Sequence, residues 1–171
     1  FLYFQNVMCE SLCLESGSHQ FNSDVWQHAS GGCGDTRTLT DDLYESAGVN
    51  FSHVKGDSLP NSASSARAEC ANAPFDAMGV SIVIHPRNPY IPTSHMNIRL
   101  LVAQTAQGPV WWFGGGFDLT PYYGFSEDCV LWHQAAKKAC DSFELGAYEQ
   151  YKKNCDNYFY LKHRAEWRGI G

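Results

Sequence analysis

The sequence predicts an α+β fold in which an antiparallel sheet is covered by α-helices. Two runs in the middle of the chain, residues 80–85 and 95–102, alternate apolar and polar side chains with the period of two that β-strands show. A stretch rich in turn-forming proline separates the two runs. After residue 126 the apolar period changes to 3.6, which is typical of helices. Because strands come first and helices follow, the pattern favours α+β over a parallel α/β sheet.

Length and composition predict a globular chain. The 171 residues are 44% hydrophobic and 14% aromatic, which predicts a single domain over residues 1–171 with a substantial core. The net charge of −6 gives no electrostatic footprint for nucleic acid, and no apolar run approaches the roughly 20 residues of a transmembrane segment. The seven cysteines include no C-x-x-C pair, so we expect free thiols in a reducing, cytoplasmic compartment.

The N-terminal half is predicted to hold a short helix and several strands. We expect the helix over residues 6–14, with Val7 or Met8 and Leu12 on its buried side and its end at Gly17. The first six residues, FLYFQN, resemble a protease-tag remnant but could equally be native, and they are left out of the fold prediction. The glycine-rich stretch Gly31-Gly32-Cys33-Gly34 is expected to form a flexible turn. Strands are expected at 36–39, 43–45 and 49–54. Residues 57–74 are expected to form a surface loop, or a short helix around residues 63–71.

The central strands separate an apolar face from a polar one. The apolar faces carry Val80, Ile82 and Ile84 in the first run, and Met96, Ile98, Leu100 and Val102 in the second. The opposite faces carry Ser81, Val83 and His85, and then His95, Asn97 and Arg99. Ordinary solvated strands favour Lys, Glu and Thr, so a face of His, Asn and Arg indicates a site. A further strand, 109–113, holds Trp111 and Trp112, which we expect to pack on the sheet. It ends in three glycines before Asp118, and glycines allow a flat ligand to approach the backbone.

Two helices are predicted at the C-terminal end. The first follows Ser126, a good N-cap residue, and has lysines near its C-terminal end. One stripe of this helix holds Cys129, Trp132, His133, Ala136 and Cys140. The second helix is expected over roughly residues 147–164, with a stripe that holds Tyr148, Tyr151, Cys155 and Phe159, and it would include His163.

Four long blocks of the sequence resemble a known family. The blocks HPRNPYIPTSHMNIR, WWFGGGFDLTPYYGF, YKKNCDNYFYLKHR and RGIG closely resemble the signature blocks of oxygen-dependent coproporphyrinogen III oxidase. Weaker agreement in AGVNFSHVKG and DVWQHASGGCGDTRTL extends the resemblance over roughly residues 21–171. The resemblance implies a large antiparallel sheet sandwiched between α-helices, and a homodimer. It also implies the oxidative decarboxylation of two propionates of coproporphyrinogen III to vinyl groups in haem biosynthesis, with O₂ as electron acceptor and no organic cofactor.

The resemblance also implies roles for individual residues. His95 and Asp118 would be catalytic. Asp118 would accept hydrogen bonds from the pyrrole N–H groups, and His95 would assist proton transfer. The substrate-binding residues would be Ser81, Asn97, Ile98 and Arg99. The residues alone leave structural alternatives open: Arg99 could form an ion pair with Asp118 or another acid, Asp118 could cap a turn, and His95 could be structural.

Metal-dependent chemistry is a separate alternative. In metal-dependent members, the resemblance implies His85, His95, His133 and His163 as ligands of a divalent metal ion. A non-haem metal oxygenase could instead use His85, His95 and Asp118 as a two-His-one-carboxylate set, although the HxD or HxE pair that commonly begins such a site is missing. A third alternative is a non-catalytic module that binds a tetrapyrrole.

The sequence departs from the family pattern at two places. The glycine run before the first strands reads GGCGD, with Cys33 and Asp35 as additions, and the family's C-terminal segment after RGIG is absent. We therefore expect the chain to be part of a longer enzyme. We expect His95, Asn97, Arg99 and Asp118 to converge on one concave surface that is open where the missing segment would close it.

Overall fold

The computed structural model describes residues 1–18, 20–29, 31–60, 64 and 67–167. Its contacts divide the chain into two compact units. The first unit holds residues 1–87 and 95–116, and the second holds residues 88–94 and 117–171. An antiparallel sheet with helices confirms the predicted α+β class.

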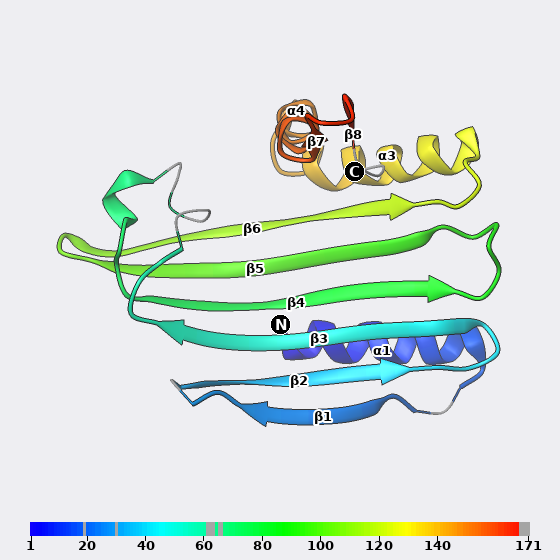
Figure 1. Ribbon diagram of the computed structural model, residues 1–171, viewed down its shortest axis with the longest axis horizontal. Helices are drawn as coiled ribbons and strands as arrows, with labels where there is room; N and C mark the ends of the chain where they lie inside the picture. Colours follow the sequence, from blue (N-terminus) through cyan, green and yellow to red (C-terminus); the bar gives the residue numbers. More distant parts are fainter. Residues whose placement is uncertain (19, 30, 61–63, 65–66, 168–171) are drawn as a thin grey trace. The chain divides into compact units, whose positions relative to one another are not determined.

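Six strands form one sheet in the order in which they follow one another along the chain. Figure 1 shows this meander, in which each strand runs opposite to its neighbours. The strands are β1 (Asn22–Gln27), β2 (Gly32–Leu39), β3 (Tyr44–Gly56), β4 (Phe75–Pro86), β5 (Thr93–Thr105) and β6 (Gly108–Thr120). The strands predicted at 43–45 and 49–54 are one strand, β3, because pairing with β2 and β4 on both sides carries it through Ala47 and Gly48. Glycines 32 and 34, predicted to lie in a turn, belong to β2.

The helix α1 (Leu2–Ser16) packs on one face of the sheet, which we call the first face. Its buried residues are Gln5, Cys9 and Leu12, and Met8 packs against the same core. That core is formed with side chains of the strands, chiefly Leu39, Tyr44, Ala47, Val49, Val80 and Ile82. The helix ends where expected, at Gly17 with a φ of 70°. However, it begins four residues earlier than predicted, so the FLYFQN segment is part of the fold.

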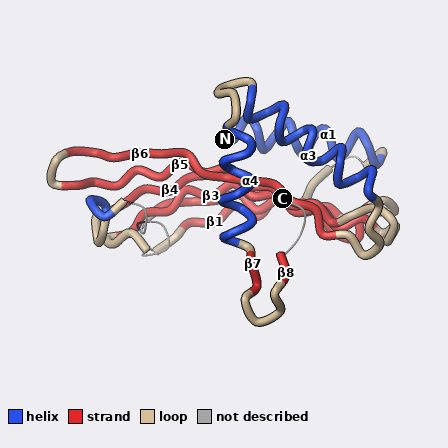
Figure 2. Tube along the Cα trace, turned by 90° about the horizontal axis from the view of Figure 1, so that it is seen from above, coloured by secondary structure: helices blue, strands red, loops and turns tan. Residues whose placement is uncertain are grey.

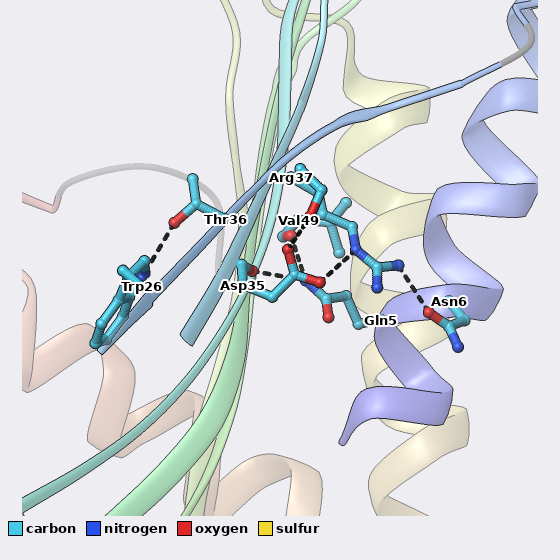
Figure 3. Close-up of polar contacts among 8 residues, drawn as sticks. Gln5, Asn6, Trp26, Asp35, Thr36, Arg37 and Val49 are labelled. Atoms are coloured by element: carbon cyan, nitrogen blue, oxygen red, sulfur yellow. Dashed lines mark hydrogen bonds and ion pairs between the residues drawn. The ribbon is translucent and has the colours of Figure 1, made fainter. Parts of the chain in front are cut away.

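Gln5 attaches α1 to the sheet (Figure 3). The side chain is fully buried, and its Nε2 donates hydrogen bonds to the carbonyl oxygens of Asp35 at 2.8 Å and Val49 at 2.9 Å. Arg37 of β2 adds a second link, because its Nη1 donates to Oδ1 of Asn6 at 2.7 Å. A polar residue therefore lies at the centre of this helix–sheet contact, which an apolar periodicity does not reveal.

The opposite face of the sheet, the second face, is covered over part of its area by the connection between β3 and β4. Leu59, Cys70 and Ala73 of this connection form a second core with Leu101 and Ala103 of β5. The connection contains the short 3₁₀ helix η1 (Ala68–Cys70), near the end of the segment 63–71 where a short helix was predicted. Residues 63, 65 and 66 of that segment lie outside the described residues. The expected apolar face of β5 is thus only half right. Met96 and Ile98 pack on the first face, but Leu101 and Ala103, not Leu100 and Val102, are buried further along, because the connection covers the second face there.

The second unit contains two helices and a hairpin. The helices are α3 (Ser126–Asp141) and α4 (Ala147–Tyr158), and the hairpin consists of β7 (Tyr160–Leu161) and β8 (Glu166–Trp167). Trp132 of α3 packs edge-on against Phe117 of β6, with ring centroids 4.8 Å apart. The predicted stripe of α3 is confirmed, since its five members are half-buried. Ser126 is the first helical residue and makes no capping hydrogen bond; Phe125 holds the N-cap position.

The second helix is shorter than predicted. It ends at Tyr158, and the residues up to 164 enter the hairpin, which Figure 2 shows extending from α4. The run Tyr158–Leu161 is rich in aromatic residues, which favour strands, and the rings of Tyr160 and Trp167 lie 5.3 Å apart across the hairpin. No helix in the described ranges is both long and apolar enough to cross a membrane.

Candidate functional site

Small polar side chains form a row across the second face of the sheet. Thr36 of β2 lies opposite Asn50 of β3, which in turn lies opposite Ser81 of β4. The Oδ1 atom of Asn50 is buried and has no hydrogen-bond partner within the described part of the chain. The row continues the polar alternation that the sequence predicts for Ser81, and it adds Thr36 and Asn50, which the sequence reasoning missed.

Arg99 of β5 lies between two glycines on the neighbouring strands. A Cβ atom at Gly79 of β4 would lie 3.0 Å from Cα and Cβ of Arg99, and a Cβ at Gly114 of β6 would lie 3.5 Å from its Nε. No side chain therefore projects beside Arg99 at either position. The Arg99 side chain is exposed, and no described residue of the first unit forms an ion pair with it. The ion pair with Asp118 that the sequence left open stays a prediction, because Asp118 lies in the second unit.

This arrangement is suited to binding a carboxylate. A guanidinium group presents a planar fork of N–H donors that matches the two oxygens of a carboxylate. The flanking glycines leave the sheet surface flat, so a planar ring can lie close to the backbone beside the fork. A glycine inside a strand pattern signals such a close approach, and Gly79 could have been singled out on that ground.

The glycine run of β6 has different neighbours at successive positions. A Cβ at Gly115 would lie 2.4 Å from the carbonyl oxygen of Asn97, so this glycine allows β5 and β6 to pair closely. Gly116 has open space where its side chain would be. Of the preceding tryptophans, Trp112 packs against the second core beneath the guanidinium of Arg67, at 4.8 Å. Trp111 is 62% exposed and contacts the ring of Phe113, so the prediction of sheet packing holds for Trp112 and is wrong for Trp111.

The other predicted site residues are distributed over both units. His95 and Asn97 are half-buried on β5 in the first unit, and Asp118 is half-buried on β6 in the second. The convergence of His95, Asn97, Arg99 and Asp118 on one surface stays a prediction. The Ile98 side chain packs against the first core, so on the polar face only its main chain is left to meet a ligand.

The four histidines of the predicted metal set lie in different surroundings. His85 is exposed on β4 opposite Ser46. His133 of α3 has its Nδ1 atom 3.0 Å from the hydroxyl of Tyr148, and burial, aided by the charge of Lys152, lowers its pKa. His163 is exposed in the hairpin turn, so its predicted place on a helix is wrong. Within the described ranges no three His, Cys, Asp or Glu residues form a group that could hold a metal ion. Both metal sets stay predictions.

The antiparallel sheet and its exposed, glycine-flanked arginine define an α+β protein with a candidate site for a flat, carboxylate-bearing ligand. A family model described as coproporphyrinogen III oxidase matches residues 1–171. The chain therefore belongs to the coproporphyrinogen III oxidase family, as its sequence blocks predict. Members of this family are oxidoreductases of haem biosynthesis.

Proposed function

We propose that this protein oxidatively decarboxylates two propionates of coproporphyrinogen III with O₂ as the electron acceptor. At each propionate, R–CH₂CH₂–COO⁻ + O₂ + H⁺ gives R–CH=CH₂ + CO₂ + H₂O₂. The substrate loses two electrons at each step, and O₂ accepts them. The electron-rich reduced pyrrole reacts with O₂, so that no flavin or nicotinamide is required.

The observation that supports this proposal most directly is the setting of Arg99. Coproporphyrinogen III is a tetrapyrrole with four propionates, so it combines planar rings with carboxylates. The Arg99 side chain is exposed and lies between Gly79 and Gly114. In this proposal it pairs with one propionate while a pyrrole ring lies over the glycines.

The remaining roles belong to polar side chains predicted from the sequence. The Asp118 carboxylate accepts hydrogen bonds from the pyrrole N–H groups and stabilises positive charge on the ring during attack by oxygen. His95 transfers protons, and Asn97 and Ser81 bind polar groups of the substrate. We further propose that the enzyme acts as a cytoplasmic homodimer, which sedimentation velocity of the purified protein tests.

Substitution of Arg99 tests the proposal. We expect Arg99→Ala to raise KM for coproporphyrinogen III by about 30-fold, because a charged hydrogen bond to a carboxylate contributes about 2 kcal/mol. Asp118→Ala is expected mainly to lower kcat. The measurements are oxygen uptake and chromatographic detection of the divinyl product. A matched control is Arg164→Ala, which removes an exposed arginine that pairs with Glu166 at 2.7 Å and should leave both constants unchanged.

Two outcomes would count against the proposal. Wild-type KM in Arg99→Ala would remove Arg99 from substrate binding, and binding of coproporphyrin without oxygen uptake would favour a non-catalytic tetrapyrrole module. Chelation tests the alternative of a non-haem metal oxygenase. Activity that survives exhaustive removal of divalent metals excludes that alternative.

A further inference from the structure

A cavity of about 320 Å³ lies between α1 and the strands β1 and β2 in the first unit, remote in sequence from Arg99. Its lining includes Cys9, Glu10 and Cys13 of the helix together with Phe21 and Arg37. Two thiols, one guanidinium and one aromatic ring thus share a small space. The proposed function uses none of these groups.

The two thiols are placed to act together. Positions 9 and 13 are one helical turn apart, so their Cβ atoms lie about 5–6 Å from one another on the same side of α1. Cys9 is 7% exposed, Cys13 is half-buried, and both are free of disulfide bonds. A single ion between the two sulfur atoms can reach both.

Arg37 supplies positive charge beside the first thiol. Its Nε donates to Oδ2 of Asp35 at 2.8 Å, and its guanidinium lines the same cavity as the Cys9 thiol. Burial raises the pKa of the Cys9 thiol, and the contact with Arg37 opposes this shift; burial also raises the pKa of Cys13, and the charge of Asp41 adds to it. A thiol binds a metal ion as a thiolate, so each thiol releases its proton when the ion binds.

We infer that this cavity is a dithiol site for a soft monovalent cation, Cu(I), which Cys9 and Cys13 bind as two thiolates. The exchange is Cu⁺ + 2 R–SH → [Cu(SR)₂]⁻ + 2 H⁺, with no change of oxidation state. The complex carries one negative charge, which the Arg37 guanidinium faces.

The donor set selects the metal. Thiolates favour soft ions such as Cu(I), and Cu(I) accepts two thiolates without further ligands. Structural zinc requires four ligands, and the described residues offer no group of three potential ligands here or elsewhere. Glu10 lines the same cavity, but it is an exposed, hard oxygen donor and poorly matched to Cu(I).

Competition with a chromophoric chelator tests the site. The reduced full chain is titrated without oxygen against Cu(I) held by bathocuproine disulfonate, and the loss of the complex's absorbance gives the Cu(I) transferred. We expect the wild type to take up one more equivalent of Cu(I) than the double variant Cys9→Ser/Cys13→Ser. Each single variant should bind about 100-fold more weakly, because binding by the second thiolate is intramolecular. The matched control is Cys129→Ser/Cys140→Ser, which removes two half-buried thiols of α3. This variant should bind as many equivalents of Cu(I) as the wild type.

A second measurement avoids any effect of substitution on folding. The wild type with one equivalent of Cu(I) is treated with N-ethylmaleimide, and the labelling of each cysteine is followed by mass spectrometry. We expect labelling of Cys9 and Cys13 to slow together, while that of the exposed Cys33 is unchanged. Equal protection of all cysteines, or an equivalent of Cu(I) retained by Cys9→Ser/Cys13→Ser, would overturn the inference.

Discussion

At the residue scale, Arg37 and Arg99 carry the same charge in opposite surroundings. Arg37 donates hydrogen bonds to the side chains of Asp35 and Asn6 within the protein. Arg99 lies between two glycines, and its side chain is exposed. The hydrogen bonds of the Arg37 guanidinium therefore hold α1 and β2 together, whereas the Arg99 guanidinium is available to a ligand.

Asp41 links stability to pH. Its pKa is lowered from 3.8 to about 2, chiefly by a hydrogen bond from the Ser18 hydroxyl, with backbone N–H groups of Tyr44 and Leu43 adding to the shift and burial opposing it. The folded-state pKa lies below the unfolded value. The stabilisation is therefore complete above about pH 4 and is lost as the pH falls towards 2.

The substitution Asp41→Asn should remove this stabilisation. We expect it to lower the free energy of unfolding by about 1 kcal/mol at pH 7, a figure reduced for the partial exposure of the carboxylate. The difference from the wild type should shrink as the pH falls from 4 to 2. Urea denaturation at several pH values measures it. Asp42→Asn, at an exposed neighbour, is the control, and an equal loss in both variants would contradict the assignment.

Residues on the strands were predictable from the sequence where alternation alone decides their place. Ser81, Asn97 and Arg99 lie on the polar face as expected, because a strand has only two faces. Gln5 was missed, since a buried amide that bonds two carbonyl oxygens has no periodic signature. Gly79 was missed because its contribution is the absence of a side chain beside Arg99.

At the scale of single elements, α1 depends on Gln5. Gln5→Met keeps a similar volume and removes the donor that reaches Asp35 and Val49. We expect the free energy of unfolding to fall by about 2 kcal/mol, because two buried carbonyl oxygens lose a partner. Chemical denaturation followed by circular dichroism measures it. Tyr3→Ala, at a position of the same helix that is 81% exposed, should change stability by less than about 0.5 kcal/mol; similar losses in both variants would remove Gln5 from this role.

The glycine run of β6 offers a matched pair of substitutions. Gly115→Ala would place a Cβ atom 2.4 Å from the carbonyl oxygen of Asn97, so β5 and β6 must separate, and we expect a loss of about 2 kcal/mol. Gly116→Ala meets open space and should alter stability by less than about 0.5 kcal/mol. Thermal unfolding of the two variants compares them. Equal melting temperatures would show that the strands tolerate a side chain at Gly115.

The sequence located elements better than it located their ends. Strong alternation placed β4 and β5, and the helical stripe placed α3. The strand β3 was divided in two because Ala47 and Gly48 are weak strand formers, and only pairing with two neighbours makes the strand continuous. The prediction extended the helix α4 too far because the aromatic residues after Tyr158 also fit a helical spacing. Their strand conformation depends on pairing with Trp167, which a helical spacing does not reveal.

For the whole molecule, charge and exposed aromatic surface together govern solubility. The net charge is −6 and the isoelectric point is about 5.5, while Trp111 and Phe113 on the edge strand β6 are 62% and 66% exposed. We expect light scattering to rise as the pH approaches 5.5 and to fall again at pH 8, because loss of net charge removes the repulsion between molecules. Trp111→Thr/Phe113→Thr should reduce the rise, and Tyr3→Ser should not. Equal scattering by the two variants would show that β6 is not the associating surface.

The order of strands in the sheet has a consequence for synthesis on the ribosome. In the six-stranded sheet, each strand from β2 to β6 pairs with the strand made immediately before it, so its pairing does not wait for a later strand to be translated. Such pairing needs only short loop closures, apart from the connection between β3 and β4, and short closures cost little chain entropy. The helix α1 is the exception. It is made before the strands, and its buried side, including Gln5, finds a partner only when β2 and β3 have followed.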